Sequence, residues 1–144
     1  MLRTFAVVLL LQLLAVPAMA ASFEVGQVWS YRTRPGEDAS RLYIARIDRD
    51  LSAKAIFHLY IDGLTLKNPL VEGEVQDHLP HVPVSRETLE ASVIALQAEN
   101  VLPPDISEGY VLWREAFEQG RAGVFTLSVQ EIVQYIEDAF NKPK

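Results

Sequence analysis

The stretch AIFHLYID, residues 55–62, predicts a β-strand with one face in a hydrophobic core. Successive side chains of a strand point to opposite faces, so the apolar and the polar residues of this stretch separate into two sets. The apolar set is Phe57, Leu59 and Ile61, and the other set is His58, Tyr60 and Asp62. The first set is expected to pack inside the domain, while the second set forms a face of mixed polarity.

Two further strands are predicted on the N-terminal side of this stretch. VGQVWSYRT (25–33) and RLYIARID (41–48) are short and rich in the β-branched and aromatic residues that favour strands. Turn-forming residues separate the three segments at PGED (35–38) and RDLS (49–52), and both connections have hairpin lengths. The order predicts an antiparallel meander.

The second half of the chain predicts helices. Ser85 is a candidate N-cap for a helix over about 86–99, on which Leu89, Val93 and Leu96 recur at helical spacing. A second helix is expected over about 106–119, ending at Gly120. After a short β-like segment, AGVFTL (122–127), the capping box SVQE (128–131) begins an apolar stripe that runs to Phe140. The predicted class is α+β: a small antiparallel β-meander followed by about three helices packed on one face.

Residues 1–20 have the pattern of a signal peptide, with a basic start, a short apolar run and the small residues Ala18-Met19-Ala20. Cleavage after Ala20 is expected to leave a single globular domain, residues 21–144, released in soluble form. Export of a chain without cysteine fits a bacterial periplasm or bacterial secretion, and it rules out disulfides and thiol catalysis.

The charge of the chain argues against several partners. Without Arg3, the mature chain carries 12 basic and 19 acidic side chains, a formal charge of −7. Such an acidic protein repels phosphate backbones, so no nucleic-acid partner is expected. No transmembrane segment is expected after signal cleavage.

The stretch DHLPHVP (77–83) is the main candidate for chemistry. An odd separation places His78 and His81 on opposite faces of a strand, and Pro80 excludes a helix, so only a turn near Pro80 would bring them together. A metal set of His58, Asp77, His78 and His81 would then suit zinc and hydrolysis. The alternative is a proline-rich loop whose histidines bind no metal, in which case no cofactor is expected.

The segment 65–84 is rich in proline and glycine, which is typical of a long binding loop. The hypothesis for its binding surface comprises Tyr60, His78, His81 and Trp113. Core packing is the alternative for the aromatic residues, and exposure to solvent is the alternative for acids such as Glu108 and Glu115. The phosphate-binding and nucleophile-elbow glycine motifs are absent from the sequence.

Five stretches together resemble a loose group of small exported bacterial proteins of unknown function: VGQVWSYRTRPGE, YIDGL, HLPHVPVS, EGYVLWREAF and AGVFTLSVQEIVQYIE. The resemblance implies a single compact exported domain and carries no activity. The leading hypothesis is a non-enzymatic exported domain that binds a partner protein or small ligand through the 65–84 loop. The alternatives are a metal-dependent hydrolase centred on His78 and His81, and a structural protein of the cell envelope.

Overall fold

The computed structural model describes residues 21–143, so the predicted signal peptide lies outside the described residues. Its centre is a five-stranded antiparallel sheet in the order β6-β3-β2-β1-β7. The three predicted strands are present and pair in the predicted meander. The strand bounds are β1 Val28–Tyr31, β2 Leu42–Asp48, β3 Ile56–Ile61, β6 Leu79–Val84 and β7 Val93–Ala98.

In the described part of the chain, three α-helices complete the fold and confirm the predicted α+β class: α1 (Arg86–Ser92), α2 (Ser107–Glu118) and α3 (Val129–Phe140). Ser85 caps α1, and Ser128 and Glu131 form the predicted capping box of α3. None of these helices within residues 21–143 is long and apolar enough to span a bilayer.

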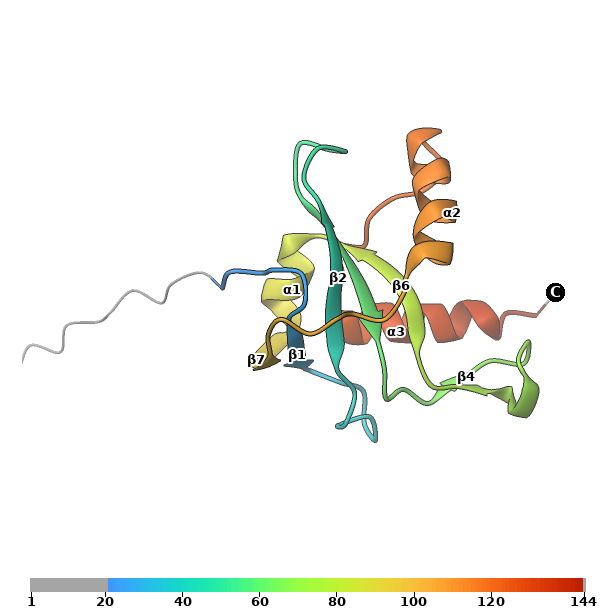
Figure 1. The fold of residues 1–144 in the computed structure, drawn as a ribbon. Helices are drawn as coiled ribbons and strands as arrows, with labels where there is room; N and C mark the ends of the chain where they lie inside the picture. The colour runs from blue at the N-terminus through green and yellow to red at the C-terminus, as the bar shows by residue number, and fades with distance from the viewer. Residues whose placement is uncertain (1–20, 144) are drawn as a thin grey trace, which may run out of the picture.

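The helices divide between the two faces of the sheet (Figure 1). α1 and α3 cover the face that carries Phe57, Leu59 and Ile61, and these three side chains are fully buried, as predicted. α2 lies over the opposite face, where Tyr110 and Trp113 pack with Ile56. The expectation that the helices pack on one face therefore holds for α1 and α3 only, because α2 covers the opposite face and buries His58 there.

The predicted helix over 86–99 is wrong in its second half. α1 ends at Ser92, and residues 93–98 form strand β7, which pairs with β1 at the edge of the sheet. Leu89, Val93 and Leu96 have helical spacing, but Leu89 lies in α1 while Val93 and Leu96 lie in β7. Val93 and Ile94 are β-branched, and pairing with the otherwise open edge of β1 outweighs a weak helical preference.

The segment 65–84 is not one irregular loop. Residues 66–67 (β4, Leu66–Lys67) and 75–76 (β5, Val75–Gln76) form a small hairpin that carries a 3₁₀ turn, Glu72–Glu74. β6 then returns to the main sheet along β3. β6 tolerates Pro80 and Pro83 because it is the terminal strand, where backbone N–H groups are not all needed for the sheet.

Candidate functional site

A β-bulge in β6 places His78 on the same face of the sheet as His58 and His81, the face that α2 covers. Along β3 and β6, Leu59 pairs with Val82 and Ile61 pairs with Leu79, so Pro80 and His81 together oppose Tyr60. The extra residue reverses the alternation of side chains between His78 and His81. The expectation that a strand would send these histidines to opposite faces is therefore wrong, because it assumed a regular strand without a bulge.

The imidazole of His58 lies at the centre of a buried hydrogen-bond chain. Its Nε2 is 2.9 Å from Oδ2 of Asp48 on β2, and its Nδ1 is 2.9 Å from Nε2 of His81. The hydroxyl of Tyr110 donates to the same oxygen of Asp48 at 2.8 Å, and Nε of Arg46 donates to the other oxygen at 3.0 Å. One carboxylate thus accepts three side-chain hydrogen bonds, with the His58 side chain fully buried.

The available donors and acceptors define where the protons are. A carboxylate only accepts, so His58 donates its Nε2–H to Asp48 and, when neutral, offers a bare Nδ1. His81 must then donate its Nε2–H to that nitrogen. The hydrogen bond between Nδ1 of His58 and Nε2 of His81 requires one proton between these two atoms. If both atoms carried a proton, two N–H groups would face each other and repel. The pair can therefore hold one positive charge without breaking this contact, but not two.

Burial sets the titration of the pair. It lowers the pKa of His58, against the opposing influence of Asp48, and it lowers the pKa of His81 to about 4, with the charge on His58 contributing. Burial also raises the pKa of Asp48, but the hydrogen bonds from Tyr110 and Arg46 outweigh it and leave that pKa below its ordinary value. At neutral pH the cluster is one carboxylate beneath two neutral imidazoles.

Helix α2 closes over the pair with aromatic side chains and a glycine. The ring of Tyr110 meets His58 edge-on with centroids 4.9 Å apart, and that of Trp113 lies 4.8 Å from His58. Gly109 allows the helix to approach, because a Cβ on it would lie 2.7 Å from the Cβ of His81.

Replacing Gly109 by alanine is expected to lower the free energy of unfolding by about 1–2 kcal/mol, although alanine is the better helix former. The added methyl has to displace β6 or α2, since the opposing atom is a Cβ and not a flexible tip. Gly123→Ala is the matched control, because no atom lies within 4 Å of a Cβ at that position. Urea unfolding of both variants makes the comparison, and equal stabilities would contradict the close approach of α2.

The other predicted site residues form a second, exposed pair beside the first. Nδ1 of His78 is 2.7 Å from Oδ1 of Asp77, and its ring stacks on Tyr60 with centroids 5.5 Å apart. The four predicted metal ligands therefore form two separate pairs, His58 with His81 and Asp77 with His78. Within residues 21–143, no group of three or more histidine, aspartate or glutamate side chains is arranged to hold a metal ion.

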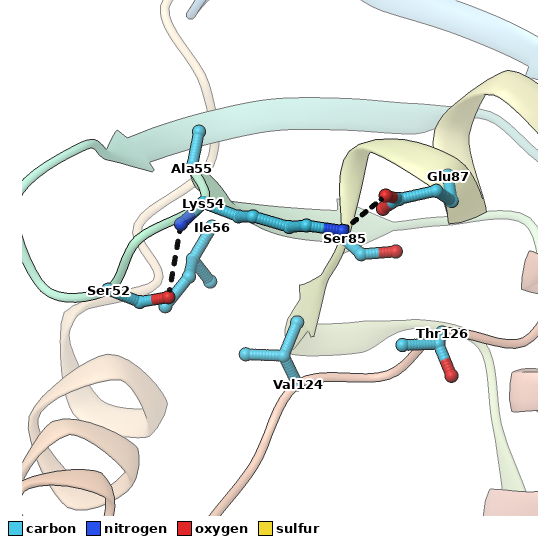
Figure 2. A pocket seen from close by; sticks show the side chains of 8 residues that line it. All are labelled: Ser52, Lys54, Ala55, Ile56, Ser85, Glu87, Val124 and Thr126. Atoms are coloured by element: carbon cyan, nitrogen blue, oxygen red, sulfur yellow. Dashed lines mark hydrogen bonds and ion pairs between the residues drawn. The ribbon is translucent and has the colours of Figure 1, made fainter.

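One cavity lies apart from the predicted binding residues. Figure 2 shows this cavity of about 290 Å³, which is lined in part by Ala55, Ile56 and Val124. Lys54 reaches across it to Glu87, with 3.0 Å between Nζ and Oε1. None of Tyr60, His78, His81 and Trp113 lines it. Trp113 has a core role instead, packing on His58 while its Nε1 donates to the carbonyl oxygen of Gly123.

Asp48 and Arg46 were missed by reasoning from the sequence, although a signal for them exists. They are two residues apart in RLYIARID and so share one face of β2. In the observed register Arg46 pairs with His58, and Asp48 pairs with Ile56. A buried aspartate on an apolar strand, facing a histidine across a hairpin, is a pattern that predicts a polar cluster.

The β4–β5 hairpin presents a second candidate surface. It extends away from the main sheet on the side where α3 ends (Figure 1). At its tip, the side chains of Leu70 and Val75 are 75% and 56% exposed. Both lie within the predicted binding segment 65–84.

Comparisons with known protein families, with curated proteins and with solved structures found no match to this chain. The function is therefore argued from the residues themselves.

Proposed function

We propose that this protein is an exported, non-catalytic domain that binds a partner protein through the tip of the β4–β5 hairpin. The observation that carries the proposal is the exposure of Leu70 and Val75 on a hairpin that is itself firmly held. Large apolar side chains on a rigid projection bind a partner with little loss of conformational entropy. The signal-peptide pattern of residues 1–20 supports export.

The hairpin is held internally by Asn68, which is buried. Its Nδ2 donates to Oε1 of Gln76 at 2.8 Å, its Oδ1 accepts from the backbone N–H of Leu70 at 3.0 Å, and its own N–H donates to the carbonyl of Glu74. Glu74 adopts a positive φ of 57°, a conformation that costs about 1 kcal/mol or more for a residue other than glycine. The exposure of the tip thus belongs to a defined conformation.

The base of the hairpin is attached to α3 and to the β1–β2 turn. Glu137 of α3 accepts from the backbone N–H of Lys67 at 2.8 Å, and Asn141 donates to the carbonyl of Lys67. Glu37, buried and paired with Arg34, accepts from the backbone N–H of Thr65 at 2.7 Å. These contacts transmit the rigidity of the core to the tip.

The chemistry of the tip indicates the kind of partner. Glu72 and Glu74 flank the apolar residues and are exposed. A complementary surface is an apolar pocket that accepts Leu70 and Val75, with lysine or arginine at its rim. Raising the salt concentration is expected to slow association with such a partner and to weaken binding.

The double substitution Leu70→Ser with Val75→Ser is expected to weaken binding of this partner by about 100-fold, because it removes both apolar anchors. The partner is first isolated from the cell envelope on immobilised wild-type protein, then purified and titrated against each variant by calorimetry. Leu102→Ser with Val111→Ser is the matched control, since those side chains are 92% and 60% exposed and lie outside the hairpin. Equal loss in both double variants, or no loss in either, would refute the hairpin as the binding site.

Deleting all of residues 65–84 is unsuitable as a test. Leu79, Val82 and Val84 of β6 are buried in the main core, so the deletion would remove a strand of the sheet. Point substitutions at the tip leave that core intact.

The metal-dependent hydrolase is the less favoured alternative. The nitrogens of His58 and His81 that face each other are hydrogen-bonded at 2.9 Å, so a metal could use both only after that bond is broken. The structural envelope role stays a prediction without a specific supporting contact.

A further inference from the structure

A polar cavity of about 420 Å³ lies beside the buried cluster, where the C-terminal end of β2 meets α2. Three arginines line it: Arg46 and Arg49 from the β2 end, and Arg114 from α2. Its remaining walls are formed by the neighbours of these residues on the β2–β3 connection. On a chain of net charge −6, this is a local concentration of positive charge.

Two of the three guanidinium groups are held in position by contacts that leave at least one terminal nitrogen unused. Nε of Arg46 donates to Asp48 at 3.0 Å, and its guanidinium carbon lies 4.3 Å from the centroid of the Tyr110 ring. Arg114 donates through Nε to Glu118 at 2.9 Å and through Nη1 to the hydroxyl of Tyr110 at 3.3 Å. Within residues 21–143, both terminal nitrogens of Arg46 and Nη2 of Arg114 have no hydrogen-bond partner.

Two aspartates among the lining residues offset part of this charge, because three arginines and two aspartates leave the lining with a net charge of +1. Glu118, the partner of Arg114, lies outside the lining. Asp48 already accepts hydrogen bonds from His58, Tyr110 and Arg46. Asp50 and Arg49 are exposed on the connection, and neither forms a side-chain hydrogen bond with another described residue. The arginines therefore present open donors to a cavity whose lining keeps a net positive charge.

We infer that this cavity is a binding site for a small anion that carries a carboxylate or phosphate group. Arginine presents parallel N–H donors that match two oxygens of such a group, and donors already held by neighbours lose little freedom on binding. The site lies on the side of β2 and α2, apart from the hairpin tip, and it is independent of the proposed protein partner.

The test uses the arginine side-chain signals of the intact protein in ¹⁵N NMR at pH 7 and low salt. Inorganic phosphate and succinate are titrated separately, and the tighter of the two identifies the preferred anionic group. The expected result is saturable movement of the Nε–H signals of Arg46 and Arg114. If the signals of all arginines instead shift equally and in linear proportion to the anion concentration, the anions only screen the charges of the protein, and the inference is overturned.

Variants give a second reading of the same site. Arg114→Gln and Arg49→Gln are each expected to weaken the saturable binding by about tenfold, since each removes charged donors. Neither side chain forms a hydrogen bond with Asp48, so these variants are expected to stay folded. Arg121→Gln, an exposed arginine just after α2, is the control. Unchanged affinity in both cavity variants would overturn the assignment.

Discussion

Replacing Asp48 by alanine is expected to lower the free energy of unfolding by about 3–5 kcal/mol. The carboxylate accepts from His58, Tyr110 and Arg46, and His58 is fully buried. Removing it leaves the Nε2–H of His58 and the hydroxyl of Tyr110 without their acceptor. The loss is large because two buried donors are orphaned at once.

Urea unfolding measured by circular dichroism at pH 7 determines this change. Asp50→Ala is the matched control: it removes the same group two residues away, where the side chain is exposed, and is expected to change stability by less than about 0.5 kcal/mol. Asp48→Asn separates hydrogen bonding from charge, since its amide keeps one acceptor. A loss below about 1 kcal/mol in Asp48→Ala would show that the cluster is not closed to water.

The stability of the domain is expected to fall by about 1–2 kcal/mol between pH 7 and pH 5, after allowance for the partial exposure of His81. The pKa of His81 is about 4 in the folded protein against 6.5 for an ordinary histidine, and burial lowers the pKa of His58 as well. Below pH 6.5 the unfolded chain therefore binds more protons than the folded one. Stability rises with pH across this window and is lost as the pH falls toward 4.

Variants assign this loss to the histidine pair. His81→Gln removes the titrating ring while its amide N–H can still reach Nδ1 of His58, so it should reduce the loss between pH 7 and pH 5 by at least half. His78→Ala, which removes a neighbouring, partly exposed histidine outside the buried chain, is the matched control. Carboxylates such as Glu37 and Asp48 act in a lower window, because their lowered pKa values make their contribution disappear only in more acidic solution. Identical pH profiles for wild type and His81→Gln would contradict the buried pair.

The sequence predicted the meander and two of the three helices because their signals are local. Alternation in AIFHLYID identifies which face of β3 is core, and the capping box at Ser128 marks the start of α3. β7 was missed because its partner, β1, is more than sixty residues away in the chain, and no local pattern reports an open sheet edge. Strand β6 within 65–84 was hidden by Pro80 and Pro83, which a terminal strand tolerates.

The candidate site was predicted only in its parts. His58, His81 and Trp113 were singled out, and they do meet, whereas His78 shares their face only because of a bulge at Pro80 and His81 that alternation alone does not reveal. A second register shift near Ala45 aligns Arg46 with His58, and so completes the cluster. Such shifts depend on how three strands fit together, which explains why Asp48 was overlooked.

Site-specific photocrosslinking from the hairpin tip tests the proposed function most directly. A photoreactive amino acid replaces Leu70 in one variant and Leu102, which is even more exposed and lies outside the hairpin, in another. Both are expressed in the native cells and irradiated. We expect one discrete adduct from position 70, with an envelope protein whose crosslinked surface is an apolar pocket rimmed by basic residues, and none from position 102. No adduct at position 70, or the same adducts from both positions, would contradict binding through the hairpin.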